Sequence, residues 1–61
     1  MDTFAAELHQ RITSAREHLR AAQDTGDLDA ERIYSGELDS LIHQALENGI
    51  TVPSEDTGQH T

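Results

Sequence analysis

The chain has no cysteine, no lysine, a single proline and only two aromatic side chains in its 61 residues. Without cysteine, neither a disulfide framework nor a thiolate metal site can stabilise so short a chain. No apolar run approaches the length of a membrane-spanning helix, and the N-terminus carries an acid where a secretory signal would carry a base. We therefore expect one small domain, stabilised by packing alone and located in the cytoplasm.

Positive charge is scarce as well. Four arginines stand against twelve acidic residues, which gives a formal net charge of -8. A field of that sign opposes non-specific attraction to nucleic acid and to anionic lipid. We therefore expect protein partners, with a basic or cationic surface favoured, and no membrane partner.

Apolar residues recur every three or four positions in two stretches, which is the pattern of an amphipathic helix. The first stretch predicts a helix over about 3–24 and the second predicts one over about 28–48. A turn at about 25–27 separates them, with Gly26 suited to a left-handed position and Asp27, or alternatively Asp29, suited to capping the second helix. A turn this short makes the two helices antiparallel.

The second helix ends where Gly49 suits the left-handed position after a helix and Pro53 prevents its continuation. Residues 53–61 contain no apolar anchor, so we expect a flexible polar tail there. The fold class is therefore all-α, with a helical hairpin over 1–52. Folding it about Gly26 pairs Ile12 with Leu41.

Two helices alone do not close a core, because each apolar stripe is too wide for a single partner. We expect the uncovered part to form an interface. Two hairpins can pair as a homodimeric four-helix bundle, or a different protein can supply the missing helices. The expected interface residues are the apolar members of both stripes: Phe4, Leu8, Ile12, Leu19, Tyr34, Leu38, Leu41, Ile42 and Leu46.

One isoleucine does not fit this pattern. Ile33 lies roughly 130° from the centre of the second stripe, near Gly36 and Ser40. It can be an ordinary exposed apolar residue. Alternatively, Ile33, Gly36 and Ser40 form a groove for a partner, or Gly36 breaks the helix and turns Ile33 inward.

The stretch from Tyr34 to Ile42 reads YSGELDSLI, and an Ile-x-x-x-Arg-x-x-Leu pattern precedes it at residues 12–19. These motifs resemble the S-Q-E-L-D signature region of the short sporulation-regulating aspartyl-phosphate phosphatases, which are also two-helix proteins. Ser35, Glu37 and Asp39 match the signature, as does Leu38, while Gly36 stands in place of its glutamine. The resemblance implies docking on a phosphorylated receiver domain, with Ser35, Glu37 and Asp39 as candidate catalytic residues and Asp39 the first to test.

Two further likenesses are architectural. The acidic, lysine-free composition is similar to that of short helical-hairpin proteins encoded in actinobacterial genomes, which implies no activity. The layout is also similar to the small dimeric hairpin that holds paired RNA loops in plasmid copy-number control. That likeness would give Arg11, His18 and Arg20 an RNA-binding role, although they form a sparse basic track without a stacking aromatic.

Metal binding and cofactors are not expected. The four histidines are far apart in sequence, and the row formed by Asp39, His43 and Glu47 is better read as an exposed ladder of polar side chains. A structural zinc site requires four ligands. The leading hypothesis is therefore a non-catalytic helical hairpin that works by association.

Overall fold

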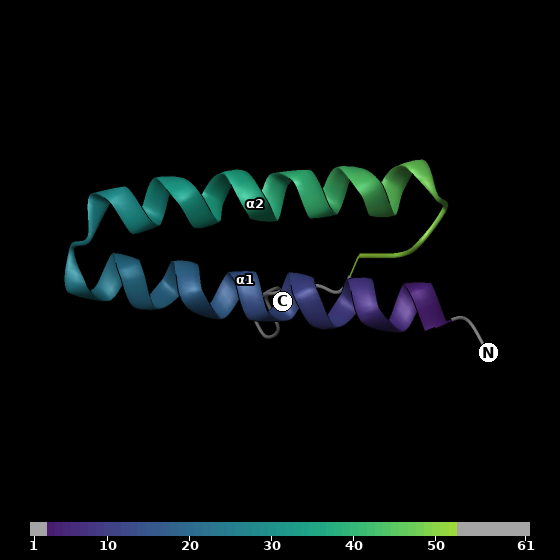
Figure 1. The fold of residues 1–61 in the computed structure, drawn as a ribbon, viewed down its shortest axis with the longest axis horizontal. Coiled ribbons are helices and arrows are strands. Elements are labelled where there is room, and N and C mark those ends of the chain that lie inside the picture. The colour runs from purple at the N-terminus through teal and green to yellow at the C-terminus, as the bar shows by residue number, and fades with distance from the viewer. Residues whose placement is uncertain (1–2, 53–61) are drawn as a thin grey trace, which may run out of the picture.

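The computed structural model describes residues 3–52, which form two α-helices joined by a tight turn (Figure 1). Helix α1 spans Thr3–Thr25 and helix α2 spans Leu28–Glu47. The helices lie antiparallel and side by side, which confirms the expected all-α hairpin. The predicted tail at 53–61 lies outside the described residues.

The turn is built from a glycine and an aspartate. Gly26 has a φ of 74°, a left-handed conformation that glycine adopts without a steric penalty. The backbone N–H of Asp27 donates to the carbonyl of Ala22 at 2.9 Å, and that of Gly26 donates to Gln23 at 3.3 Å. These two hydrogen bonds form a Schellman motif, which satisfies the last carbonyls of α1.

Asp27 also begins the next helix. Its carboxylate accepts a hydrogen bond from the backbone N–H of Ala30 at 3.1 Å, so it is the N-cap of α2. Asp29 and Glu31 add negative charge to the first turn of α2, where the helix dipole favours it. One residue therefore takes part in both the end of α1 and the start of α2, so the turn contains no additional loop residues.

A second Schellman motif ends α2. Gly49 has a φ of 68°, and the N–H of Ile50 donates to the carbonyl of Ala45 at 2.8 Å. The N–H of Gly49 donates to the carbonyl of Leu46 at 3.2 Å. Gly49 therefore takes the left-handed position after α2 that the sequence pattern predicts.

The core lies along the seam between the helices. Ile12 and Ala45 are fully buried in this seam. Small residues such as Ala15 allow the helix backbones to approach, and the expected pairing of Ile12 with Leu41 falls within this one cluster. The buried cluster consists of Leu8, Ile12, Ala15, Leu41 and Ala45.

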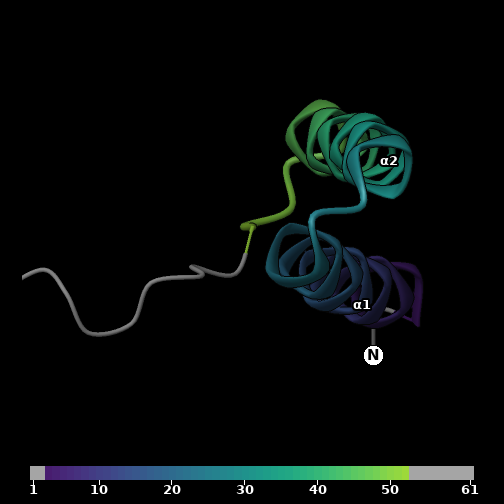
Figure 2. The same ribbon diagram turned by 90° about the vertical axis from the view of Figure 1, so that its left-hand side faces the viewer.

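Residues 50–52, which we call the return segment, fold back toward α1 after α2 ends. Figure 2 shows this segment leaving α2 on one side of the hairpin and descending beside α1. Ile50 and Val52 pack against the core cluster. The side-chain Nε2 of His9 lies 2.7 Å from the carbonyl oxygen of Thr51, a hydrogen-bond distance between α1 and the segment.

The buried positions correct one sequence-based expectation. A lone hairpin was expected to leave part of Leu8 and Ile12 exposed, but both are buried within the single chain. The return segment contributes to this result, since Ile50 and Val52 pack against the cluster that holds them. Leu8 and Ile12 therefore stabilise the hairpin and offer no surface to a partner.

Within residues 3–52, no helix is long and apolar enough to cross a lipid bilayer.

Candidate functional site on helix α2

The described surface exposes four large apolar side chains, and three of them belong to α2. Leu28 is 72% exposed, Leu46 is 66% exposed and Ile33 is 63% exposed. Phe4, at the open end of α1, is 48% exposed. Both ends of α2 therefore expose a leucine to solvent.

Leu28 and Leu46 lie on the same line along α2. They are eighteen residues apart, which is about five turns at 3.6 residues per turn. Between them run Leu38 and Ile42, which are only partly buried although they pack against the core. We call the resulting surface the α2 flank: Leu28, Ser35, Leu38, Asp39, Ile42 and Leu46.

A shallow open depression lies at the middle of this flank. It is lined by Ser35, Gly36, Leu38, Asp39 and Ile42. Apart from its chain neighbours and the adjacent backbone of its own helix, a Cβ atom placed on Gly36 would meet no atom within 4 Å. The glycine is therefore not required by packing inside the hairpin, and its missing side chain keeps the depression open.

The groove expected from Ile33, Gly36 and Ser40 is only partly matched. Gly36 lines the depression, but Ile33 and Ser40 are not among its lining residues. Helix α2 runs unbroken through Gly36, and Ile33 points outward. The alternative in which Gly36 breaks the helix and turns Ile33 inward is therefore wrong.

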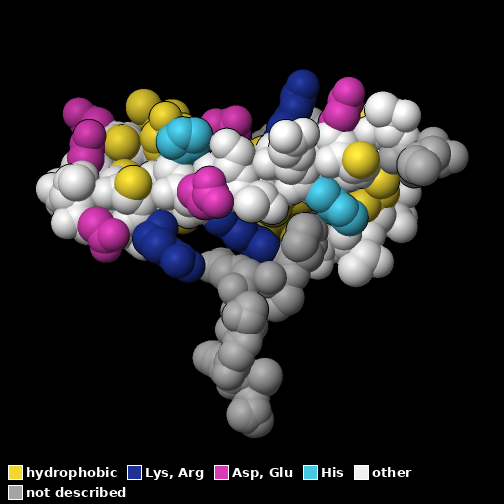
Figure 3. Space-filling model, turned by 90° about the horizontal axis from the view of Figure 1, so that it is seen from below, with side chains coloured by type: hydrophobic (Ala, Val, Ile, Leu, Met, Phe, Trp, Pro, Cys, Tyr) yellow, Lys and Arg dark blue, Asp and Glu magenta, His cyan; other side chains and the backbone are white. Residues whose placement is uncertain are grey.

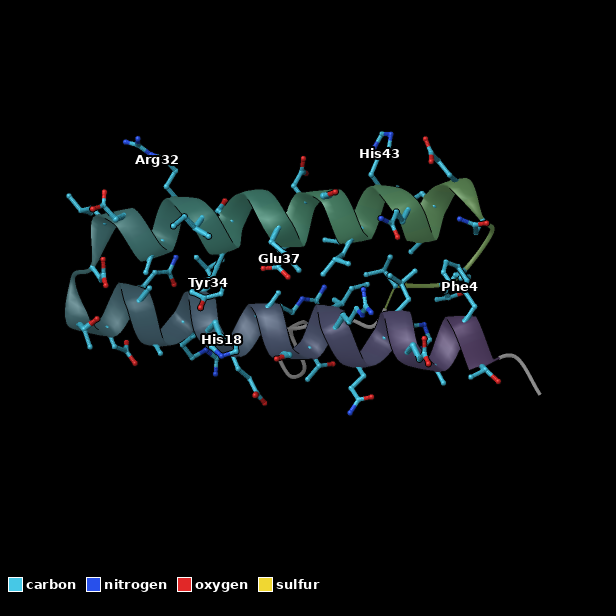
Figure 4. The ribbon with its side chains drawn as sticks, viewed as in Figure 1. Phe4, His18, Arg32, Tyr34, Glu37 and His43 are labelled. Atoms are coloured by element: carbon cyan, nitrogen blue, oxygen red, sulfur yellow. The ribbon has the colours of Figure 1, made fainter. Side chains whose placement is uncertain are left out.

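The residues of the phosphatase-like motif divide between two sides of α2. Ser35 and Asp39 line the depression together, one turn apart. Glu37 does not line it and lies on the side of α2 that faces the viewer in Figure 4, beside Tyr34.

Comparisons with protein-family models, with curated proteins and with solved structures find no match. The resemblance thus rests on the motif itself.

Three histidines make identifiable contacts. His43 lies 3.3 Å from Glu47 on the outer face of α2, with both side chains well exposed. The ring of His18 stacks on that of Tyr34, with centroids 4.8 Å apart and planes 13° from parallel, and Figure 4 shows the two side chains next to each other at α1. His9 contacts the return segment. Among the described residues, no three potential ligands gather into a metal site.

The outer surface of α1 has a different character. Seen from the α1 side, charged and histidine side chains separate the hydrophobic ones into small groups (Figure 3). An open depression on α1 is lined mainly by polar residues, among them His9, Thr13 and Glu17. The surface of α1 thus lacks the pair of aligned leucines that marks α2.

The candidate RNA-binding residues do not share one face of α1. Arg11 and Arg20 are nine residues apart, which is about two and a half turns, so they point in opposite directions. His18 is engaged with Tyr34. Helix geometry therefore divides this set, which weighs against a single phosphate-binding track.

The expected interface residues fall into three groups. Leu8, Ile12 and Leu41 are buried, and Phe4 and Leu46 are exposed. Leu28 was missed, although its eighteen-residue spacing from Leu46 is visible in the sequence. The remaining members are half-buried: Leu19, Tyr34, Leu38 and Ile42.

Proposed function

We propose that this protein is a non-catalytic association module whose α2 flank packs against another helix. The observation that carries the proposal is the exposure of Leu28 and Leu46 on one line of a hairpin whose core is already filled. The free energy falls when a partner removes apolar side chains of this size from water. The core does not need these leucines, so their position is best explained by binding.

The acidic composition supports a protein partner over a nucleic acid. Helix α2 carries Asp29, Glu31, Glu37, Asp39 and Glu47 against the single arginine Arg32. Such a surface opposes the densely charged phosphate backbone of a nucleic acid. A cytoplasmic location is part of the same proposal, and the absence of cysteine supports it, because small secreted domains usually depend on disulfides.

Site-specific photo-crosslinking tests whether the α2 flank is a contact surface. A photoreactive amino acid at position 46, in the chain expressed in its own host, is expected to give a covalent product with a protein, either a second copy or another chain. The same residue at Ser14, on the exposed face of α1, is the matched control. Products are detected by gel shift and mass spectrometry. If position 46 yields no more product than position 14, the proposal is wrong.

A second candidate function follows from the motif. Because Ser35 and Asp39 line one depression, we also propose that the flank can engage a phosphorylated receiver domain and promote hydrolysis of its aspartyl phosphate. A carboxylate beside a hydroxyl can orient a water molecule for attack on the phosphoryl group.

The receiver hypothesis predicts faster loss of phosphate from a receiver of the host when the protein is added. Asp39→Ala is expected to abolish the acceleration, because the carboxylate that orients the water is removed. Asp24→Ala, an exposed acid at the end of α1, is the control and should retain it. Phosphate release is followed with radiolabelled receivers. Equal activity of the Asp39→Ala variant, or no acceleration on any host receiver, rejects this candidate.

A further inference from the structure

We infer that α2 packs antiparallel against α2 of a second copy through the α2 flank, with the twofold axis at the level of residue 37 along the helix and close to Gly36. This inference rests on the proposed function and names its partner. It also differs from the four-helix bundle expected from the sequence, because the contact is made mainly by one helix of each hairpin. The argument comes from the spacing of the apolar residues, the open centre of the flank and the order of its charges.

The spacing of the two exposed leucines suits an antiparallel pair. The midpoint between Leu28 and Leu46 is residue 37. When two copies of α2 run in opposite directions about that midpoint, Leu28 of each chain lies opposite Leu46 of the other. Both leucines are then covered at both ends of the contact, over a length of about 27 Å at 1.5 Å per residue.

The centre of the flank allows close approach. Measured along the helix, Gly36 lies one residue, or about 1.5 Å, from the level of the twofold axis. It presents no side chain to the second copy there. In the same register Ser35 lies opposite Asp39 of the second copy, so that the hydroxyl can donate a hydrogen bond to the carboxylate. The depression lined by Ser35, Gly36 and Asp39 receives the matching part of the other helix.

The charges select this direction. Arg32 is exposed and points away from α1 in Figure 4. In the antiparallel register it lies about one turn from Asp39 of the second copy, within reach of a long arginine side chain. A parallel pair would instead place Arg32 beside Arg32 and Asp39 beside Asp39, which is repulsive. The two symmetric Arg32 to Asp39 contacts therefore favour the antiparallel pair.

A second copy also suits Arg32 better than a basic partner helix does. Arg32 is the one arginine of α2, and no lysine accompanies it. A basic helix on the flank would bring like charge against Arg32 at the same time as it neutralised the acids. A second copy offers a carboxylate to each Arg32, so the flank is complementary to itself.

A charge-swap experiment tests the register directly. The wild-type protein is expected to change from monomer to dimer between micromolar and millimolar concentration in sedimentation equilibrium. Arg32→Glu places two acids together at each contact, and Asp39→Arg places two arginines together. Each single variant is expected to dimerise roughly tenfold more weakly than the wild type, because two pairs become repulsive. In an equimolar mixture, a dimer with one chain of each variant has opposite charges at both contacts. One contact joins the introduced glutamate and arginine, and the other joins the unchanged Arg32 and Asp39. The mixture is therefore expected to dimerise like the wild type.

The controls use two exposed charged residues of α1. Arg11→Glu and Glu17→Arg change the same charges on an exposed surface outside the flank, and neither should alter the dimer. Circular dichroism confirms that each variant keeps its helix content. The absence of a wild-type dimer, or the absence of recovery in the mixture, overturns the inference. The crosslinking result at position 46 decides the proposed function separately, since a product with a different protein would preserve that function while rejecting the second copy.

Discussion

Replacing Ile12 by alanine is expected to lower the free energy of unfolding by about 2–5 kcal/mol, the range for large-to-small changes in a core. Ile12 is the largest side chain that is fully buried, and it belongs to the cluster formed by both helices. A chain of this length has a total stability of only about 3–9 kcal/mol. The variant should therefore be partly or largely unfolded at room temperature.

The matched control for this substitution is Ile33→Ala. Ile33 is exposed on α2, so its truncation removes little buried area, and alanine is the better helix former. Urea unfolding followed by circular dichroism, at a protein concentration low enough to avoid association, measures both variants. A loss of stability equal to that of Ile12→Ala would contradict the outward position of Ile33.

Replacing Ala45 by leucine is expected to lower the free energy of unfolding by about 1–3 kcal/mol, because it overfills a packed interior. Ala45 is fully buried, and its backbone carbonyl accepts the hydrogen bond from Ile50 that ends α2. A larger side chain here must separate the helices or displace the return segment. Thermal unfolding followed by circular dichroism measures the effect.

The control for Ala45→Leu is the same substitution at Ala21. Ala21 is exposed on α1, and leucine is nearly as good a helix former as alanine. The Ala21→Leu variant should keep the wild-type stability within about 0.5 kcal/mol. If Ala45→Leu is as stable as Ala21→Leu, the seam between the helices is wider than the burial of Ala45 indicates.

The helices and their ends could be predicted from the sequence because the signals are local. The three-to-four spacing of apolar residues marks each helix, and the glycines at 26 and 49 have the left-handed conformations that the pattern requires. The capping role of Asp27 depends on a residue only three positions away. Interactions over such short distances along the chain can be read without knowledge of the rest of the fold.

The return segment could not be placed in the same way. Its contacts join residues far apart in the chain, such as His9 and Thr51, and no local pattern encodes them. A helical wheel also treats Leu8 as available to a partner. The wheel represents one helix at a time, so it does not show which other segments cover that helix. The sequence pattern therefore counts the buried Leu8 and Ile12 as available to a partner, and it misses the exposed Leu28.

The motif around Gly36 shows a different limit. The sequence places Ser35, Glu37 and Asp39 close together on one helix, but their directions depend on which side of α2 faces α1. The structure brings Ser35 and Asp39 to one depression and leaves Glu37 elsewhere. Only the packing of the hairpin determines which members of the motif share a surface.

The short turn between α1 and α2 affects how fast the chain is expected to fold. Asp27 closes both helices, and the side chains of Gln23 and Glu31, which are only eight positions apart in the chain, lie 3.5 Å apart and connect the two helices across it. Contacts of such short range cost little loop entropy, so the hairpin can close outward from the turn, and rapid folding is expected of a helical topology of this kind. The return segment requires both helices to be in place before Ile50 and Val52 have a surface to cover, so it docks last.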